Sequence, residues 1–190
     1  MTLEESDWTE ENFASCISIV EGVSPDEAVH TISGGSAQRF SSREEAVAWS
    51  REEDEDDPHA VRIWVAAGDI DGRTFVWEDN GFGGSDENTA ERLSFAGTFV
   101  SMYWNVNSLM TFTFAKKGRV EMQFEALYAP DDDQWRLFES EGATRVADDD
   151  WEEAPEAHGL ALQAQLLGLP AAASPALLDD PDVEYWGTSY

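Results

Sequence analysis

The chain has 190 residues, of which 40 are acidic and 11 are basic, so its formal net charge is −29. Direct binding to nucleic acid or to an anionic membrane needs clustered basic side chains, and this composition disfavours both. A single cysteine, Cys16, allows no internal disulfide, and the acidic start MTLEESDWTEE is unlike a signal peptide. We therefore expect a cytoplasmic protein that contacts neither nucleic acid nor membrane.

The acidic residues are concentrated in five segments of the chain. Outside these segments the charge is ordinary for a globular protein, and eight tryptophans and ten phenylalanines are available to build a core. We therefore expect a folded body with the charge in loops and ends. The clusters are Glu4, Glu5, Asp7, Glu10 and Glu11; Glu52, Glu53, Asp54, Glu55, Asp56 and Asp57; Asp131, Asp132 and Asp133; Asp148, Asp149, Asp150, Glu152 and Glu153; and Asp179, Asp180, Asp182 and Glu184.

The first half of the chain predicts a strand, two helices and a hairpin. Residues 13–20 (FASCISIV) form a short apolar run typical of a strand, although the spacing also fits a helix. The motif SPDE at 24–27 predicts a helix start, and SREE at 42–45 is a capping box for a second helix. Residues 60–67 and 73–78 are strand-like, and the segment between them, GDIDG, has the turn chemistry of a hairpin.

The second half predicts a helix, three strands and a final helix. A glycine-rich turn, DNGFGGS, precedes the first helix, and Lys116-Lys117-Gly118 joins the last two strands. Residues 125–153 show no clear periodicity and are expected to be irregular. The predicted elements are a helix at 87–96, strands at 98–104, 109–115 and 119–124, and a helix at 156–168.

Hairpins outnumber strand–helix–strand units, which favours an α+β fold. We expect a single domain at 1–168, with a largely antiparallel sheet of about five to six strands and three to four short helices. Residues 169–190 are expected to form a Pro/Ala-rich connection and an acidic C-terminal tail.

A calcium-loop spacing occurs around the predicted hairpin turn. Asp69, Asp71 and Glu78 would occupy ligand positions, but Ala67 stands where the first carboxylate is required, and the flanks are strands. A plain hairpin turn is the better interpretation, and no metal site or cofactor is expected. If a divalent metal were bound, its ligands would be Asp69, Asp71, Glu78 and Asp79.

No other motif predicts a catalytic residue. The glycines at 81–84 lie between a strand and a helix, where backbone amides bind phosphate in other proteins, but the third glycine of a dinucleotide fingerprint is absent. A structural turn is favoured. Cys16 lies in an apolar run, as a buried thiol does, and the three histidines have no metal-ligand spacing.

Several segments together resemble an uncharacterised family common in actinobacteria and known only as a domain of unknown function. The segments are ISIVEGVSPDEAV at 17–29, WEDNGFGGS at 77–85, the stretch from RLSFAG to LYAP at 92–130, and GLALQAQLLGL with SPALLDD near the end. The resemblance covers most of residues 12–180. It consists of turn and core residues, so it implies a shared fold and no reaction.

These observations predict a non-enzymatic interaction or accessory domain, of the kind found in immunity proteins, whose acidic surface engages a basic protein partner. Tryptophans outside the predicted regular elements are further candidates for contact. The expected partner-binding residues are Glu52, Glu53, Asp54, Glu55, Asp56, Asp57, Asp131, Asp132, Asp133, Trp135, Asp148, Asp149, Asp150 and Trp186.

Three alternatives remain open from the sequence. A nucleic-acid mimic would block a DNA-binding protein with carboxylates aligned along one face. A divalent-metal-dependent hydrolase would need carboxylates that converge in a pocket. The charge could also be an adaptation to a salt-rich solvent.

Overall fold

In the computed structural model, residues 14–52 and 60–189 are described, and they form one eight-stranded antiparallel sheet with the strand order β2-β8-β3-β4-β1-β5-β6-β7. The strands are β1 (Ala14–Val20), β2 (Gln38–Phe40), β3 (Arg62–Ile70), β4 (Arg73–Asp79), β5 (Thr98–Asn105), β6 (Met110–Lys116), β7 (Arg119–Glu125) and β8 (Glu184–Ser189).

Six α-helices and two short 3-10 helices accompany the sheet within the described ranges. The helices are α2 (Pro25–Ile32), α3 (Arg43–Ser50), η1 (Gly83–Ser85), α4 (Glu87–Leu93), α5 (Asp132–Ser140), α6 (Asp148–Glu153), α7 (Pro155–Leu166) and η2 (Pro175–Asp179). None of these helices has the length and apolar character needed to cross a lipid bilayer.

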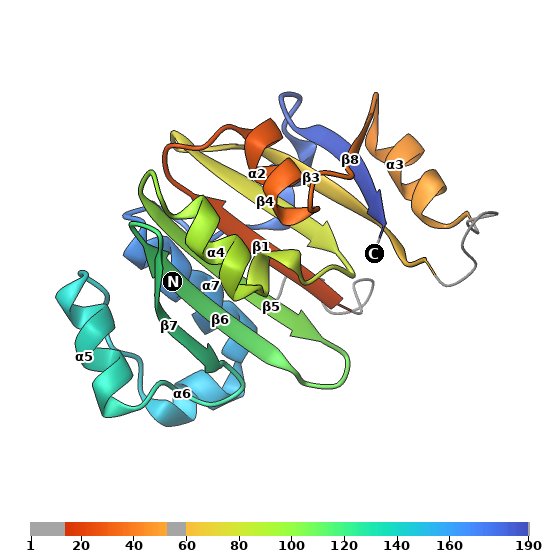
Figure 1. The fold of residues 1–190 in the computed structure, drawn as a ribbon. Helices are drawn as coiled ribbons and strands as arrows, with labels where there is room; N and C mark the ends of the chain where they lie inside the picture. Colours follow the sequence, from red (N-terminus) through yellow and green to blue (C-terminus); the bar gives the residue numbers. More distant parts are fainter. Residues whose placement is uncertain (1–13, 53–59, 190) are drawn as a thin grey trace.

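Helices cover both faces of the sheet, which is why central strands such as β1 and β5 are buried on both sides (Figure 1). Successive side chains of a strand point to opposite faces, so Ile17 and Ile19 pack on one side while Val20 packs on the other. The first face packs against α3, α5, α6 and α7 with a large aromatic core. The second face is covered by α2 and α4, with η1 over the central strands.

The α+β class and the antiparallel sheet are confirmed, and six of the predicted strands lie where they were expected. The strand number is wrong, because eight strands form the sheet and two of them, β2 and β8, were missed. β2 has three residues and no buried side chain, so it carries no apolar pattern. β8 contains Gly187, on which the Trp49 ring packs so closely that a Cβ would lie 2.4 Å from it.

The expected number of helices is also wrong, since α5 and α6 form within residues 125–153. α5 begins at a capping box made by Asp131 and Gln134, a signal hidden among consecutive aspartates. The segment 169–190, expected to be a connection and tail, supplies the strand β8, which lies between β2 and β3 inside the sheet.

Candidate functional site

Two of the predicted acidic clusters meet on one surface, formed by the start of α5 and by α6 beside the edge strand β7 (Figure 1). All of these carboxylates are exposed. Residues 131–153 contain ten acidic residues and two arginines. We call this the acidic surface; its members are Asp131, Asp132, Asp133, Asp148, Asp149, Asp150, Glu152 and Glu153.

Buried tryptophans bring the two helices together. The Trp135 ring of α5 meets the Trp151 ring of α6 edge-on, with 6.0 Å between the ring centroids. The Trp135 ring also contacts Phe138, and Phe124 of β7 lies against Trp151. Because this aromatic cluster fixes the inner sides of α5 and α6, the aspartates at the helix starts project outward from adjacent positions.

Arg145 connects the two clusters across the acidic surface. Its Nη1 atom donates to Asp132 Oδ1 at 2.7 Å, and its Nη2 atom lies 3.9 Å from Asp148 Oδ1. The hydrogen bond and charge of Arg145 lower the pKa of the Asp132 carboxyl, and the same contacts raise the pKa of Arg145. The surface thus already holds one guanidinium between two helices.

The other predicted partner-binding acids are elsewhere. Glu52 follows α3, is exposed, and lies 3.8 Å from Arg62. Residues 53–57 lie outside the described residues. The fifth cluster, at 179–184, lies between η2 and β8, near the edge of the sheet opposite β7. The described clusters therefore lie near opposite edges of the sheet.

The two tryptophans predicted to lie on the contact surface are buried instead, so this expectation is corrected. Trp135 and Trp186 are each 1% exposed. Trp135 belongs to the aromatic cluster under α5, and Trp186 belongs to β8, where the guanidinium of Arg39 lies 5.6 Å from its ring centroid. Both residues lie in regular elements that sequence patterns did not reveal.

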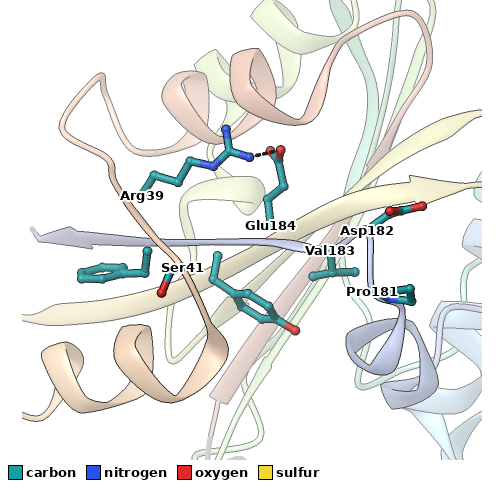
Figure 2. Close-up of a pocket in the computed structure, with 8 residues that line it drawn as sticks. Arg39, Ser41, Pro181, Asp182, Val183 and Glu184 are labelled. Carbon is teal, nitrogen blue, oxygen red and sulfur yellow. Dashed lines mark hydrogen bonds and ion pairs between the residues drawn. The ribbon is translucent and has the colours of Figure 1, made fainter.

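A hollow of about 370 Å³ lies where β2 meets β8 (Figure 2). Arg39 and Glu184 form an ion pair across it, and the Tyr185 hydroxyl donates to the Leu178 carbonyl at 2.8 Å. Burial raises the pKa of Tyr185 above its ordinary value. Arg39 and Glu184 bind each other, so the hollow presents no free acid–base pair. Its lining is Arg39, Phe40, Ser41, Pro181, Asp182, Val183, Glu184 and Tyr185.

The glycine-rich loop binds an internal anion, the carboxylate of Glu78. Gly83 N–H donates to Glu78 Oε1 at 2.9 Å and Gly84 N–H donates to Oε2 at 2.8 Å, while Glu78 is fully buried. A Cβ on Gly84 would lie 2.0 Å from Ser18 Oγ, so the loop presses directly on β1. The predicted structural turn thus closes on the chain's own carboxylate. We call this arrangement the Glu78 clamp.

Cys16 lies beside the Glu78 clamp and is fully buried. Burial raises the pKa of the Cys16 thiol well above its ordinary value, and the charge of Glu78 raises it further. The thiol is therefore protonated at neutral pH, which agrees with the interpretation of Cys16 as a small buried apolar residue. Of the histidines, His30 lies 3.8 Å from Asp26 and His158 stacks on Trp151, whereas His59 is outside the described residues.

The four carboxylates named as possible metal ligands are separated. Asp69 and Asp71 lie at the β3–β4 turn, where Asp69 Oδ1 accepts the Gly72 N–H at 3.1 Å, whereas Glu78 and Asp79 lie at the other end of β4. Glu78 and Asp79 are consecutive in a strand and point to opposite faces. Across residues 14–52 and 60–189, no three acidic, histidine or cysteine side chains are grouped as metal ligands.

The comparisons with known proteins give a family and no activity. The model of a family described as "Family of unknown function (DUF6461)" matches residues 2–174. No curated protein matches the chain, and no solved structure matches it. The expected resemblance to a domain of unknown function is confirmed.

Proposed function

This chain belongs to the DUF6461 family, and because that family has no known function, we propose from the geometry that it is a non-enzymatic interaction domain. Its acidic surface on α5 and α6 binds a basic protein partner. The domain acts as an accessory protein, of the kind found in immunity proteins, in the cytoplasm. The observation that carries this proposal is the placement of Arg145 between Asp132 and Asp148.

That contact is an intramolecular example of the recognition we propose. The side chain of Arg145 is 43% exposed, and its guanidinium is held by carboxylates of two helices. Asp149, Asp150, Glu152 and Glu153 lie on the same exposed surface, and residues 131–153 contain ten acidic side chains but two arginines. A field of one sign accelerates encounter with a cationic partner and weakens as salt is added.

The proposal is tested by affinity capture with a matched pair of variants. D148N/D149N/D150N removes three charges from the acidic surface, and D179N/D180N/D182N removes three charges near β8. Asn is close in shape to Asp, and all six residues are exposed, so both variants should fold as the wild type does. We expect wild type and the second variant to enrich basic proteins at about 0.05 M salt and to lose them at about 0.5 M.

The first variant should lose most of that enrichment. If the enriched proteins are neutral or acidic, or if they persist equally at high salt and in D148N/D149N/D150N, the acidic surface does not bind the partner. If only D179N/D180N/D182N loses the enriched proteins, the binding surface lies near β8 and the proposed location is wrong.

The remaining alternatives gain no supporting observation. A nucleic-acid mimic needs a continuous row of carboxylates, whereas the described clusters are separated from one another and lie near opposite edges of the sheet. A metal-dependent hydrolase needs converging carboxylates, and Asp69 and Asp71 are a strand length away from Glu78 and Asp79.

A further inference from the structure

Three large apolar side chains are exposed in the segments that join β5 to β6 and β7 to α5. Val106 and Leu109 lie in the turn between β5 and β6, and Tyr128 lies in the loop between β7 and α5. Their exposed fractions are 63%, 47% and 62%. Exposed apolar groups gathered beside polar ones are typical of protein-binding surfaces.

Hydrogen bonds of Ala126 join these segments to α6. The Ala126 N–H donates to the Met110 carbonyl at 2.9 Å, which connects the β7–α5 loop to the start of β6. The Ala126 carbonyl accepts the indole N–H of Trp151 at 2.9 Å, which connects the same loop to α6. Ala126, Met110 and Trp151 are buried, so these bonds fix the turn, the loop and α6 relative to one another from inside the protein.

Both apolar segments are held in a defined conformation. In the β5–β6 turn, Asn105 Oδ1 accepts the N–H groups of Asn107 at 2.9 Å and of Leu109 at 3.2 Å. In the loop, the Tyr128 N–H donates to the Glu125 carbonyl at 3.4 Å, and Asp131 then caps α5 three residues later. A surface ordered before binding loses less conformational entropy when a partner docks.

The strand register places these segments at the same end of the sheet. β5 ends and β6 begins there, with Trp104 opposite Met110, and β7 ends there, with Glu125 opposite Thr111. α5 starts from this end, so its first aspartates lie next to Tyr128 in the chain, and α6 lies beside the same end of β7 (Figure 1).

We propose that the partner binds this end of the sheet with a segment that carries both basic and apolar side chains. This inference rests on the proposed function and adds the apolar half of the interface. Val106, Leu109 and Tyr128 contact the apolar side chains of the partner, and the acidic surface pairs with its lysines or arginines. Charge decides the occupant: a second copy of this chain brings a further charge of −29, which repels the acidic surface, whereas a basic segment is attracted to it.

The two halves of the interface act differently on binding. The carboxylates increase the association rate and make affinity fall with salt, whereas buried apolar contacts slow dissociation and do not depend on counterion screening. A partner that is basic but has no apolar side chains would use the first half only. This difference makes the apolar half measurable separately.

The test uses amide NMR titrations of the full chain with short synthetic peptides of equal positive charge. One peptide alternates lysine with leucine and phenylalanine, and the other has serine in place of the apolar residues. We expect the cationic–apolar peptide to shift the amides of residues 105–110, 126–133 and 148–153. It should bind about tenfold more tightly than the cationic–serine peptide, as expected for one or two buried apolar side chains.

The variant V106S/L109S/Y128S removes the apolar half and leaves every carboxylate in place. We expect it to lose that tenfold difference between peptides while the salt dependence stays as in wild type. F95S is the matched control, because Phe95 is 74% exposed but lies between α4 and β5, near the turn at Gly118 on the other end of the sheet. It should bind both peptides as wild type does.

Two results would show that Val106, Leu109 and Tyr128 do not contact the partner, while leaving the proposed function intact. One is equal affinity of wild type for both peptides, and the other is a difference in affinity between the peptides that V106S/L109S/Y128S keeps. Concentration-dependent dimerisation in sedimentation that this variant abolishes would show a second copy as the occupant. Binding to phosphatidylcholine vesicles that the variant abolishes would show a membrane. Either result would overturn the proposal.

Discussion

The Glu78 clamp and the acidic surface use the same carboxylate chemistry in opposite environments. Glu78 is fully buried, and each of its oxygens accepts a backbone N–H from the glycine loop. The carboxylates on α5 and α6 are exposed, and Arg136 and Arg145 are the only cations within residues 131–153. The first arrangement satisfies a charge inside the protein, and the second leaves charge available to another molecule.

This difference separates stability from binding. A buried acceptor that loses its partners costs the full desolvation of the groups left behind, whereas an exposed carboxylate returns to water at little cost. The exposed carboxylates behind the net charge of −29 can therefore be replaced at little cost to the fold, whereas replacing the one internal carboxylate leaves buried N–H groups without an acceptor. Mutations at the two places should have effects of different kinds.

The largest effect is expected for Glu78→Gln. The amide group of Gln would direct a donor at one of the two loop N–H groups, so one buried donor loses its acceptor and two donors face each other. We expect a loss of about 3 kcal/mol or more in the free energy of unfolding, measured by urea denaturation. Asp149→Asn, the same kind of change on the acidic surface, should leave the urea midpoint where it is; equal losses would contradict the comparison.

A smaller loss of stability is expected for Gly84→Ala. The added Cβ would lie 2.0 Å from Ser18 Oγ and 3.0 Å from Cys16 Sγ, so the loop must move away from β1. We expect about 1–3 kcal/mol, typical of overpacking in a rigid site. Ser18→Ala removes the closest atom, so the double variant should recover part of that loss. If the loss of stability in the double variant equals the sum of the losses in the two single variants, Ser18 and the loop are not in contact.

Arg145→Gln tests the acidic surface without touching its carboxylates. The lowered pKa of Asp132 should rise toward its ordinary value, measured by NMR titration of the carboxyl carbon. Because that pKa is lowered in the folded protein, the contribution of the pair to stability is present at neutral pH and is lost as pH falls through the lowered value.

The same variant should bind the cationic–apolar peptide about two- to fivefold more tightly, since the surface loses a competing cation. Arg39→Gln removes a cation near β8 and serves as the control, with no expected change in peptide affinity. If Arg145→Gln weakens binding, Arg145 itself belongs to the interface and does not compete with the partner.

The smallest effect is expected for Asp79→Asn. The carboxylate of Asp79 is less buried than that of Glu78 and less exposed than those of the acidic surface. Burial raises the pKa of Asp79, although a Trp64 hydrogen bond and the charges of Arg43 and Arg51 oppose the shift. The folded state therefore keeps its proton at pH values where the unfolded chain has lost it, and wild type loses stability as pH rises through the raised pKa. The free energy of unfolding of Asp79→Asn, measured with urea, should therefore rise slightly relative to that of wild type as pH increases from about 4 to 7. A difference between the two proteins that does not change with pH would contradict the raised pKa of Asp79.

Sequence patterns predicted the elements whose signals are local. The motif SPDE predicted α2, and apolar, strand-like segments between turns predicted the six longer strands. β2 and β8 could not be predicted in this way. β2 is an edge strand that pairs with β8, and Gly187 of β8 makes room for the ring of Trp49, which is distant in the chain. Local sequence patterns depend on residues close in the chain, whereas β2 and β8 form through contacts with residues that are distant in the chain.

The candidate site was predictable in composition and not in assembly. The clusters at 131–133 and 148–153 are visible in the sequence. They lie close together because Trp135 contacts Trp151, and no periodicity in the sequence predicts that contact. The same hidden helices explain why Trp135 was assigned to the surface. The apolar residues Val106, Leu109 and Tyr128 left no signal at all, since single apolar residues in turns are common.

The position of β8 has a consequence for how the chain folds. β8 lies between β2 and β3, so Arg62 pairs with Ser189 and Phe40 with Tyr185, residues that are far apart in the sequence. Contacts between residues so far apart in the chain form slowly, because the entropy cost of closing a large loop comes before any favourable contact energy. We expect the six strands from β3 to β7 and β1 to assemble first, with a rate-limiting last step in which residues 184–189 enter the open edge of β3 and bring β2 with them.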